Sequence, residues 1–452
     1  MLHKKISGVS RLVLFGLIVL SLALMPACST TSDTVAPEPE TEGEAAPVEE
    51  DGTVEEPSAQ TLTILAPVDW RPILDYVAED WAAETGVTLD IVSLAYDEVQ
   101  TSIVTSATGG ADVDIIYVDT VWPAEFAQAG FLLPVEDYVT EELTSAIAPA
   151  LLDQLTWDGH LWAFPYNNQS KWLFYNETIL AEAGYDAPPA TWEEMEAMSR
   201  DMMEQGLVEY GIAWGWAQAE GLICDATVIL GGFDAVWQDA DGAWAFDEAA
   251  TVAGLEFMAN SIAEDGWADP ASISLNDRTN LNPFLAGDTA FVTNWAFAWG
   301  LIQDPNESQV VDQVAITVIP ASEGASVPSS SVTGGGGWGV MANSDTPELA
   351  AEFIQYLIGY ENQVTALSLQ QNMPIYTDMY SDPDILAEYP HFEAMGPQFE
   401  YANFRPVLPW YSEWSLQAQI EIQSVLTDAK TAQDAYTDLY QFSVEKAEEY
   451  GS

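Results

Sequence analysis

The apolar positions along residues 61–118 alternate between the periods of strands and of helices. Strands are predicted over 61–66, 87–91 and 113–118, and the last is apolar except at Asp114, which is typical of a strand buried on both faces. Between them, two helices ending at Gly86 and at Gly109–Gly110 carry apolar faces: Leu74, Val77, Ala78 and Trp81 on the first, Val99, Ile103, Val104 and Ala107 on the second. This β-α-β-α-β order predicts an α/β fold with a parallel sheet and right-handed crossovers.

Two later segments predict helices from their first residues. Thr191 follows Pro188–Pro189 and is suited to cap a helix, and Pro347 opens another. The apolar face of that second helix is Leu349, Ala350, Phe353, Ile354 and Leu357. No repeat with a period of roughly 20 to 50 residues is visible, which argues against a solenoid or a propeller.

The N-terminus has the pattern of an export signal. Basic residues precede an apolar run from Leu12 to Met25, which is too short to span a bilayer and leads into a polar, Pro-rich stretch. The run closes with Ala27-Cys28, which resembles the lipobox of bacterial lipoproteins. Residues 1–27 are therefore predicted to be a lipoprotein signal peptide, and Cys28 to carry a lipid that anchors an extracytoplasmic protein to the membrane. The alternative is an ordinary signal peptide with an accidental cysteine.

Residues 28–60 are predicted to form a disordered acidic tether, because they bury too little apolar surface to offset the entropy of ordering. About 390 residues follow, more than one hydrophobic core normally serves, so two lobes are expected. Cys224 is the only cysteine besides Cys28, so an exported chain has no internal disulfide to form. A lone cysteine in an apolar stretch is typically buried and inert.

Acidic residues far outnumber basic ones: 72 Asp and Glu against 10 Lys and Arg give a formal net charge of −62. Nucleic acid and anionic lipid surfaces are therefore excluded as partners. A cationic cargo would concentrate acids around one cleft, whereas these are spread along the chain, which favours a surface adapted to high external salt. The cations that follow the signal are Arg71, Lys171, Arg200, Arg278, Arg405, Lys430 and Lys446. Because they are so scarce, each is a candidate for a specific role.

Several motifs, in order along the chain, resemble the family 1 extracellular solute-binding proteins of ABC importers. They lie at Gly159–Tyr166, Leu173–Asn176, Ala183–Tyr185, Pro188–Glu194, Phe284–Phe291, Gly335–Gly339 and the helix that begins at Pro347. Trp162 stands where the family motif usually has tyrosine. Gln218–Leu222 and Gly336–Gly339 resemble the trehalose- and maltose-binding branch, although Ala219 replaces the usual tyrosine and so leaves the choice of sugar open.

The resemblance covers the chain after the tether and implies an α/β, type II periplasmic-binding fold in which the chain crosses three times between two lobes. One lobe would hold 61–166 and 334–371, and the other 167–333 and 372–452. It also implies a monomer that binds a di- or oligosaccharide, uses no cofactor or metal, and delivers the sugar to an ABC permease. The competing hypotheses are the same fold with a non-sugar solute, a surface glycoside hydrolase, and a glycan adhesin without transport.

A sugar presents hydroxyls around its rim and C–H patches on its faces, so its site needs polar groups in the ring plane and aromatic rings above and below. Asp119 is the leading candidate, because it follows the third predicted strand and its carboxylate can accept two hydroxyl protons. Its alternative role is a cap before Trp122–Pro123. Tyr166 and Asn167 lie at the first predicted crossover, where the walls of the cleft would meet.

Tryptophans provide the candidate stacking surfaces. Trp295 and Trp299 are four positions apart and would share a face if the stretch is helical; core packing is the alternative, and the family resemblance favours Trp295. Trp338 follows a run of glycines that includes Gly337, and glycines would let backbone N–H groups approach a ligand beside the ring. Trp70, just past the first strand, is a weaker candidate.

Arg405 precedes a proline, and the resemblance implies an Arg-Pro near the ligand, where the guanidinium could pair with a carboxylate and with sugar oxygens. A structural salt bridge is the alternative. Glu220 is a further, weaker candidate. Trp214 and Trp216 are expected in the core of a lobe.

Catalysis has little support in the sequence. The exported chain would keep only His160 and His391 as histidines, with no Gly-x-Ser-x-Gly elbow, no cysteine pair for zinc and no phosphate loop. A glycosidase needs only two suitably spaced carboxylates, which a chain with so many acids could supply. The expectation that the protein is not an enzyme therefore depends on the family resemblance.

Overall fold

The first sheet combines strands from the beginning, the middle and the end of the chain. The computed structural model describes residues 60–239 and 242–451. The strand order is β12-β11-β3-β1-β2, and β6 also pairs with β11. These strands are β1 (Thr61–Pro67), β2 (Thr88–Leu94), β3 (Ile115–Asp119), β6 (Phe164–Ser170), β11 (Ser331–Val340) and β12 (Ala402–Asn403). Because β11 is antiparallel to β3 and β6, the sheet is mixed.

The predicted β-α-β-α-β order and its parallel pairing are confirmed. Helix α1 (Arg71–Thr85) connects β1 to β2, α2 (Tyr96–Gly109) connects β2 to β3, and β1 pairs in parallel with both strands. Gly86 and Gly110 end these helices with φ angles of 76° and 68°, a left-handed conformation that glycine adopts without a steric cost. Every residue of β3 is buried, as the apolar run Ile115–Val118 predicts.

The second sheet has the strand order β10-β7-β9-β8. Its strands are β7 (Trp172–Asn176), β8 (Tyr210–Ile212), β9 (Thr289–Asn294) and β10 (Val314–Thr317). β7 is antiparallel to β9 and β10, whereas β8 is parallel to β9. A separate hairpin is formed by β4 (Thr156–Trp157) and β5 (His160–Leu161).

The chain passes from one sheet to the other over very few residues. β6 ends at Ser170 in the first sheet and β7 begins at Trp172 in the second, so Lys171 alone separates them. After β10 the chain returns to the first sheet through β11. β6 thus continues past residue 166, where the first segment of one lobe is predicted to end. The lobe boundaries stay a prediction.

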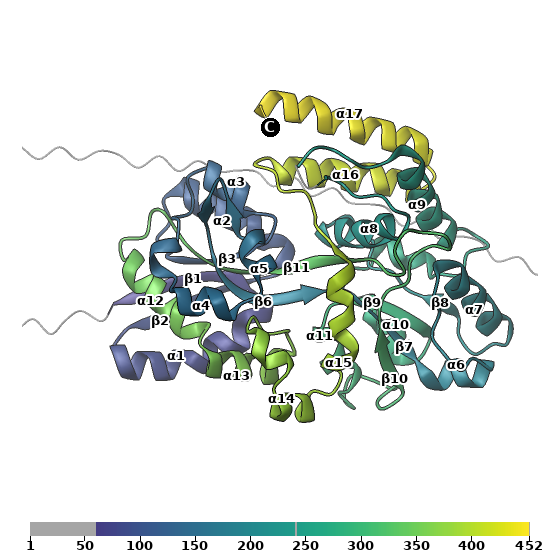
Figure 1. The fold of residues 1–452 in the computed structure, drawn as a ribbon, viewed down its shortest axis with the longest axis horizontal. Coiled ribbons are helices and arrows are strands. Elements are labelled where there is room, and N and C mark those ends of the chain that lie inside the picture. The colour runs from purple at the N-terminus through teal and green to yellow at the C-terminus, as the bar shows by residue number, and fades with distance from the viewer. Residues whose placement is uncertain (1–59, 240–241, 452) are drawn as a thin grey trace, which may run out of the picture. The chain divides into compact units, whose positions relative to one another are not determined.

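Helices surround both sheets (Figure 1). They are α3 (Pro123–Gln128), α4 (Glu141–Ala146), α5 (Pro149–Gln154), α6 (Glu177–Ala183), α7 (Trp192–Glu204), α8 (Glu220–Gly232), α9 (Glu248–Ser261), α10 (Leu281–Ala286), α11 (Phe297–Ile302), α12 (Pro347–Leu357), α13 (Tyr360–Gln370), α14 (Pro383–Glu388), α15 (Phe392–Met395), α16 (Tyr411–Leu426) and α17 (Ala432–Tyr450). Short 3-10 turns are η1 (Val68–Trp70), η2 (Glu136–Tyr138), η3 (Pro270–Ser274), η4 (Thr377–Tyr380) and η5 (Gly396–Tyr401). The paired helices α16 and α17 pack on each other and on α9 (Figure 1).

Two helix starts agree with their sequence signals. The Thr191 side chain accepts the backbone N–H of Glu194 over 3.1 Å, which confirms its predicted role as the cap of α7. α12 begins at Pro347, and its buried residues include Ala350, Phe353, Ile354 and Leu357 of the predicted apolar face.

Large aromatic side chains contribute much of the core. Trp214 and Trp216 are buried and stack with ring centroids 5.0 Å apart, which confirms their predicted place in the core. Cys224 has a free, buried thiol whose pKa is raised by burial, as expected of an inert cysteine. The described residues fall within one compact unit. In this part of the chain, no helix combines the length and the apolar character needed to cross a bilayer.

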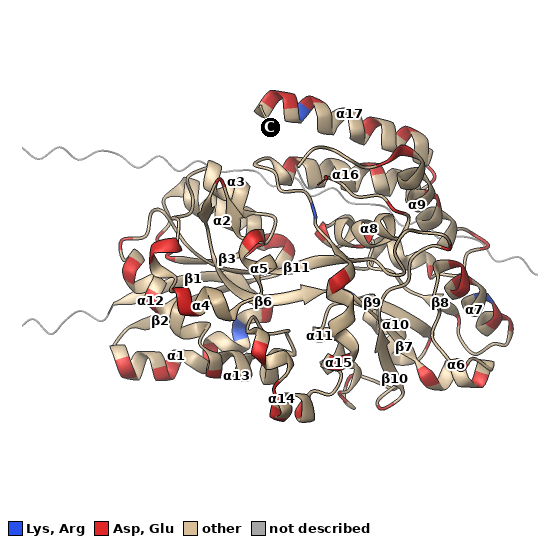
Figure 2. Cartoon of the chain, in the orientation of Figure 1, with Lys and Arg blue, Asp and Glu red and all other residues tan. Residues whose placement is uncertain are grey.

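Acidic residues are distributed over helices around both sheets, with few Lys and Arg among them (Figure 2). This agrees with the spread of acids along the sequence, and adaptation to high salt stays a prediction. The predicted signal peptide, the lipid site at Cys28 and residues 28–59 of the tether lie outside the described residues.

Candidate functional site

Arg405, in the connection between β12 and α16, joins two carboxylates from separate parts of the fold. Its Nη2 donates to Asp119 Oδ1 and its Nη1 to Glu220 Oε1, both over 2.7 Å. Asp119 ends β3 of the first sheet, whereas Glu220 begins α8, which lies between two strands of the second sheet along the chain. The three side chains are 2%, 7% and 16% exposed respectively. The structure therefore brings together three of the predicted site residues.

Hydroxyl groups also bind both carboxylates of the ionic cluster that Arg405, Asp119 and Glu220 form. Tyr96 donates to Asp119 Oδ2 over 2.5 Å, and the hydroxyls of Tyr411 and Ser415 donate to Glu220. Sequence reasoning missed both tyrosines. Each is the first residue of a helix, α2 and α16, so the only available signal was a polar aromatic residue at a helix start.

Asp119 stabilises the turn before α3, although the N-cap of that helix is Trp122 and no side chain caps it; a contact of Asp119 with a sugar stays a prediction. Its Oδ1 accepts the backbone N–H of Val121 over 3.2 Å, which fixes the turn before α3, and also accepts from Arg405. Burial raises the pKa of Glu220, and the Arg405 charge opposes that shift. Burial alone would lower the pKa of Arg405, but Asp119 and the neighbouring acidic groups hold it well above its ordinary value. One guanidinium therefore faces two carboxylates, and the group has an excess of negative charge.

Four aromatic rings from four segments pack beside the ionic cluster. Trp70 of η1 lies 5.1 Å from Tyr117 of β3 and 5.2 Å from Tyr166 of β6, measured between ring centroids. Tyr166 in turn lies 5.5 Å from Trp338 of β11. Tyr117 and Asp119 are two positions apart on one strand, so their side chains leave the same face of the sheet. The aromatic cluster therefore adjoins the ionic cluster.

The predicted crossover residues belong to this aromatic cluster. Asn167 Oδ1 accepts from the Tyr117 hydroxyl over 3.3 Å, and the Tyr166 hydroxyl donates to Gln370 Oε1 over 3.1 Å. Gln370 Nε2 donates to the backbone oxygen of Asp69 over 2.5 Å. These bonds tie β6, α13 and η1 together around the aromatic rings.

The glycine run in β11 serves strand packing. Gly337 pairs with Val118 of β3 and Pro165 of β6, and an added Cβ would clash with the carbonyl oxygen of Phe164. Trp338 is fully buried, so in this conformation its indole is not an open platform. The indole N–H groups of Trp338 and Trp70 have no hydrogen-bond partner among the described residues. Ligand contacts of Gly337, Trp338 and Trp70 stay predictions.

Trp295 lies between β9 and α11 and is partly buried. The condition under which it would share a helix face with Trp299 is not met, because α11 begins only at Phe297. Trp299 instead stacks on His391 with centroids 5.0 Å apart. The Trp295 Nε1 donates to Asp277 Oδ2 over 2.8 Å, and the ring lies against Gly334 of β11. β11 thus contacts both Trp295 and the aromatic cluster. Because the ionic cluster adjoins the aromatic cluster, Trp295 and the two clusters all lie at the junction of the two sheets.

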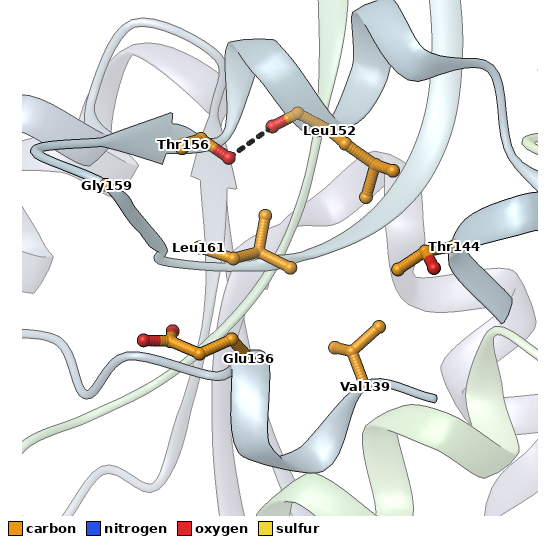
Figure 3. Close-up of a pocket in the computed structure, with 7 residues that line it drawn as sticks. All are labelled: Glu136, Val139, Thr144, Leu152, Thr156, Gly159 and Leu161. Carbon is orange, nitrogen blue, oxygen red and sulfur yellow. Dashed lines mark hydrogen bonds between the residues drawn. The ribbon is translucent and has the colours of Figure 1, made fainter. Parts of the chain in front are cut away.

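A surface pocket occurs elsewhere, between η2, α4, α5 and the β4–β5 hairpin (Figure 3). Its lining is Glu136, Val139, Thr144, Leu152, Thr156, Gly159 and Leu161, none of which is a predicted site residue. At one edge Glu136 pairs with His160 over 2.5 Å, and the hydrogen bond raises the pKa of the exposed imidazole. Within residues 60–239 and 242–451, no group of three or more His, Cys, Asp or Glu is arranged to hold a metal ion.

Comparison with known proteins extends these observations. A "probable ABC transporter-binding protein" of Deinococcus radiodurans is 27% identical over 364 residues, which cover 77% of this chain and 84% of the relative. The maltotriose-binding protein of Pyrococcus abyssi is 22% identical, over 76% of this chain and 72% of its own length. The maltose-bound MalE3 of T. maritima is similar in structure, with a TM-score of 0.79 at 24% identity, over 85% of this chain and 98% of its own.

The structural similarity confirms the predicted type II periplasmic-binding fold. The model of one protein family, described as bacterial extracellular solute-binding protein, matches residues 68–364. That range contains more than half of the chain and both sheets except for β1 and β12. The chain therefore belongs to the family 1 bacterial extracellular solute-binding proteins.

Proposed function

We propose that the protein binds a di- or oligosaccharide at the junction of the two sheets and delivers it to an ABC permease. The observation that carries this proposal is the convergence of the Arg405 cluster, the aromatic cluster and Trp295 at that junction. The sugar-binding relatives of the same family support the choice of cargo.

The chemistry of the junction suits a sugar. Asp119 and Glu220 offer acceptors and Arg405 offers donors to hydroxyl groups, while indole and phenol rings suit the C–H faces of a pyranose. Arg405 Nε has no hydrogen-bond partner among the described residues, although the side chain is buried. A buried donor of this kind gains stability when a ligand oxygen accepts from it.

Binding at this place also provides a transport signal. Residues 61–166 with 334–371 and residues 167–333 with 372–452 are our proposal for the two lobes. A sugar that contacts both lobes only when they are closed shifts the population toward the closed form. The permease would recognise that form.

The location follows from the N-terminal sequence. The protein would be exported, lipidated at Cys28 and held at the outer side of a membrane by the tether up to residue 60, as a monomer without a cofactor. Radiolabelled palmitate should label the wild-type protein in cells and fail to label Cys28→Ser, which should leave the membrane fraction. Labelling of the variant would contradict the anchor.

Calorimetric titration against a sugar panel that includes trehalose and maltose tests the cargo. We expect one sugar to bind, and we expect Trp295→Ala and Asp119→Asn to weaken its binding by at least about tenfold. Trp299→Ala is the matched control, because its ring stacks on His391 rather than at the junction. No response to any sugar, together with tight binding of a peptide or polyamine, would favour the same fold with another cargo. Product release from a chromogenic glycoside would favour a hydrolase.

A further inference from the structure

Lys171 is the single residue between β6 of the first sheet and β7 of the second, and its side chain is completely buried. Its backbone N–H donates to Ser331 Oγ over 3.1 Å, and the same hydroxyl donates to the Lys171 carbonyl oxygen over 2.8 Å. Ser331 is the first residue of β11, the strand that returns to the first sheet. Two of the connections between the sheets are therefore joined at Lys171.

The Lys171 ammonium group binds two carboxylates, one in α8 and one in the connection between η3 and α10. Its Nζ lies 2.6 Å from Asp225 Oδ1 and 2.7 Å from Asp277 Oδ1. Burial alone would lower the pKa of Lys171, but the two carboxylates outweigh that effect and raise it, so the lysine stays charged. The Asp225 side chain is 2% exposed, whereas that of Asp277 is 20% exposed.

The second oxygen of Asp277 fixes the indole of Trp295. Asp277 Oδ2 accepts the Trp295 N–H over 2.8 Å, and the Asp277 backbone oxygen accepts Asn294 Nδ2 over 2.7 Å. Lys171 Nζ lies 5.2 Å from the centre of the indole ring. The ring also lies against Gly334, where a Cβ would overlap it. The indole thus contacts both a charged pair and the bare backbone of β11.

We propose that Lys171 and Asp277 are positioning residues that hold Trp295 in the orientation in which it stacks on the ligand. This inference rests on the proposed function, which assigns the stacking role to Trp295. A buried ion pair by itself stabilises a fold little better than apolar residues of the same volume would. Here the third member of the group is an indole N–H at the ligand site, and that contact gives the charged pair a functional role.

The position of the ring can be measured without a ligand. The full chain labelled with 5-fluorotryptophan gives a fluorine NMR resonance for each tryptophan, and the resonance lost in Trp295→Phe identifies Trp295. We expect Asp277→Ala and Lys171→Met to shift or broaden that resonance while the Trp299 resonance keeps its position. An unchanged Trp295 resonance in both variants would overturn the inference.

The effect on binding can be isolated with a double-mutant cycle, using as the probe the sugar that the panel identifies or, if several bind, maltose. In the chain that keeps Trp295, Asp277→Ala should weaken binding about tenfold. In the Trp295→Phe variant the same substitution should weaken binding less than about threefold, because phenylalanine cannot donate to the carboxylate. Equal losses in the two backgrounds would contradict positioning through the indole. If Trp295→Ala leaves binding unchanged, the proposed site itself is wrong; if only Asp277→Ala does so, the proposed function stands and this inference fails.

A glycine substitution provides a test that leaves the charges intact. Gly334→Ala adds a methyl group where the indole lies and should weaken binding by at least about tenfold. Gly396→Ala is the matched control, because an added Cβ there meets nothing within 4 Å, and it should bind normally. Normal binding by Gly334→Ala would show that the ring is not required at this place.

Discussion

Arg405 and Asp119 form a buried ion pair across 286 positions of sequence, with 2.7 Å between Nη2 and Oδ1. The same guanidinium holds Glu220, so one cation joins the end of a strand in the first sheet to the start of a helix associated with the second. This pair is the centre of the candidate site, and several measurable consequences depend on it.

Removal of Arg405 should be costly to stability. Arg405→Met leaves two buried carboxylates without their partner and should lower the free energy of unfolding by about 3–5 kcal/mol. Denaturation with urea measures the change. The matched control is Arg200→Met, whose ion pair with Glu196 is about two-fifths exposed on both sides and should cost less than about 1 kcal/mol. Equal losses in the two variants would show that the Arg405 pairs contribute no more than a surface salt bridge.

Stability should rise as the pH falls from 7 to 5, partly because of Asp225. Burial raises the pKa of its carboxyl from 3.8 to about 6, although Lys171 opposes the shift. The folded state therefore holds this proton more tightly than the unfolded state does. The stabilisation is fully present below about pH 4 and is lost as the pH rises through about 6, with a slope of at most about 1.4 kcal/mol per pH unit.

The pH dependence is measured by urea denaturation at several pH values. Asp225→Asn cannot titrate and should show a flatter dependence between pH 5 and 7 than the wild-type protein. Asp75→Asn, at a side chain that is 54% exposed, should keep the wild-type slope. An unchanged slope in Asp225→Asn would mean that Asp225 is ionised in the folded protein throughout this range.

The site should reject acidic sugars. Arg405 and Lys171 each pair with two carboxylates, and Arg278 pairs with Asp69, so these cations are already compensated. If maltose binds, maltobionate should bind at least about tenfold more weakly than maltitol, which has the same open chain without a carboxylate. Calorimetry at about 0.1 M and about 1 M NaCl should find a smaller difference at high salt, since screening weakens the repulsion. Equal affinities at low salt would contradict this prediction.

The whole protein should be more stable in salt. A formal charge of −62 repels itself, and the Debye length falls from about 10 Å at 0.1 M salt to about 3 Å at 1 M. We expect the Tm in scanning calorimetry to rise by at least several degrees between these concentrations, with NaCl and KCl equally effective. A Tm that falls or stays constant would mean that self-repulsion is not a significant cost to this fold.

The local pattern was sufficient to predict the first three strands and their helices, because apolar periods and the terminal glycines act over a few residues. The end of β3 also identified Asp119 as a candidate, since a strand end is visible in the sequence. The partners of Asp119 could not be predicted in the same way. Glu220 and Arg405 are 185 positions apart, and no local pattern indicates which of 72 acids a given arginine will meet.

Two interpretations depended on tertiary information that the sequence does not carry. Spacing alone suggested that Trp295 and Trp299 share a helix face, but Asn294 Oδ1 accepts the backbone N–H of Trp295 and the helix starts two residues later. The glycines of β11 were interpreted as a backbone approach to a ligand. The structure places strands β3 and β6 on both sides of Gly337, which leaves no room for a side chain, and the ligand contact stays a prediction.

The scarcity of lysine has a practical consequence for experiments on this protein. Among the described residues the lysines are Lys171, which is buried, and Lys430 and Lys446, whose side chains are 33% and 22% exposed. Within this part of the chain, reagents that attack primary amines should react just before α17 and near its end. Dyes or sensor surfaces coupled through amines would then attach around that helix and leave the junction of the sheets unmodified.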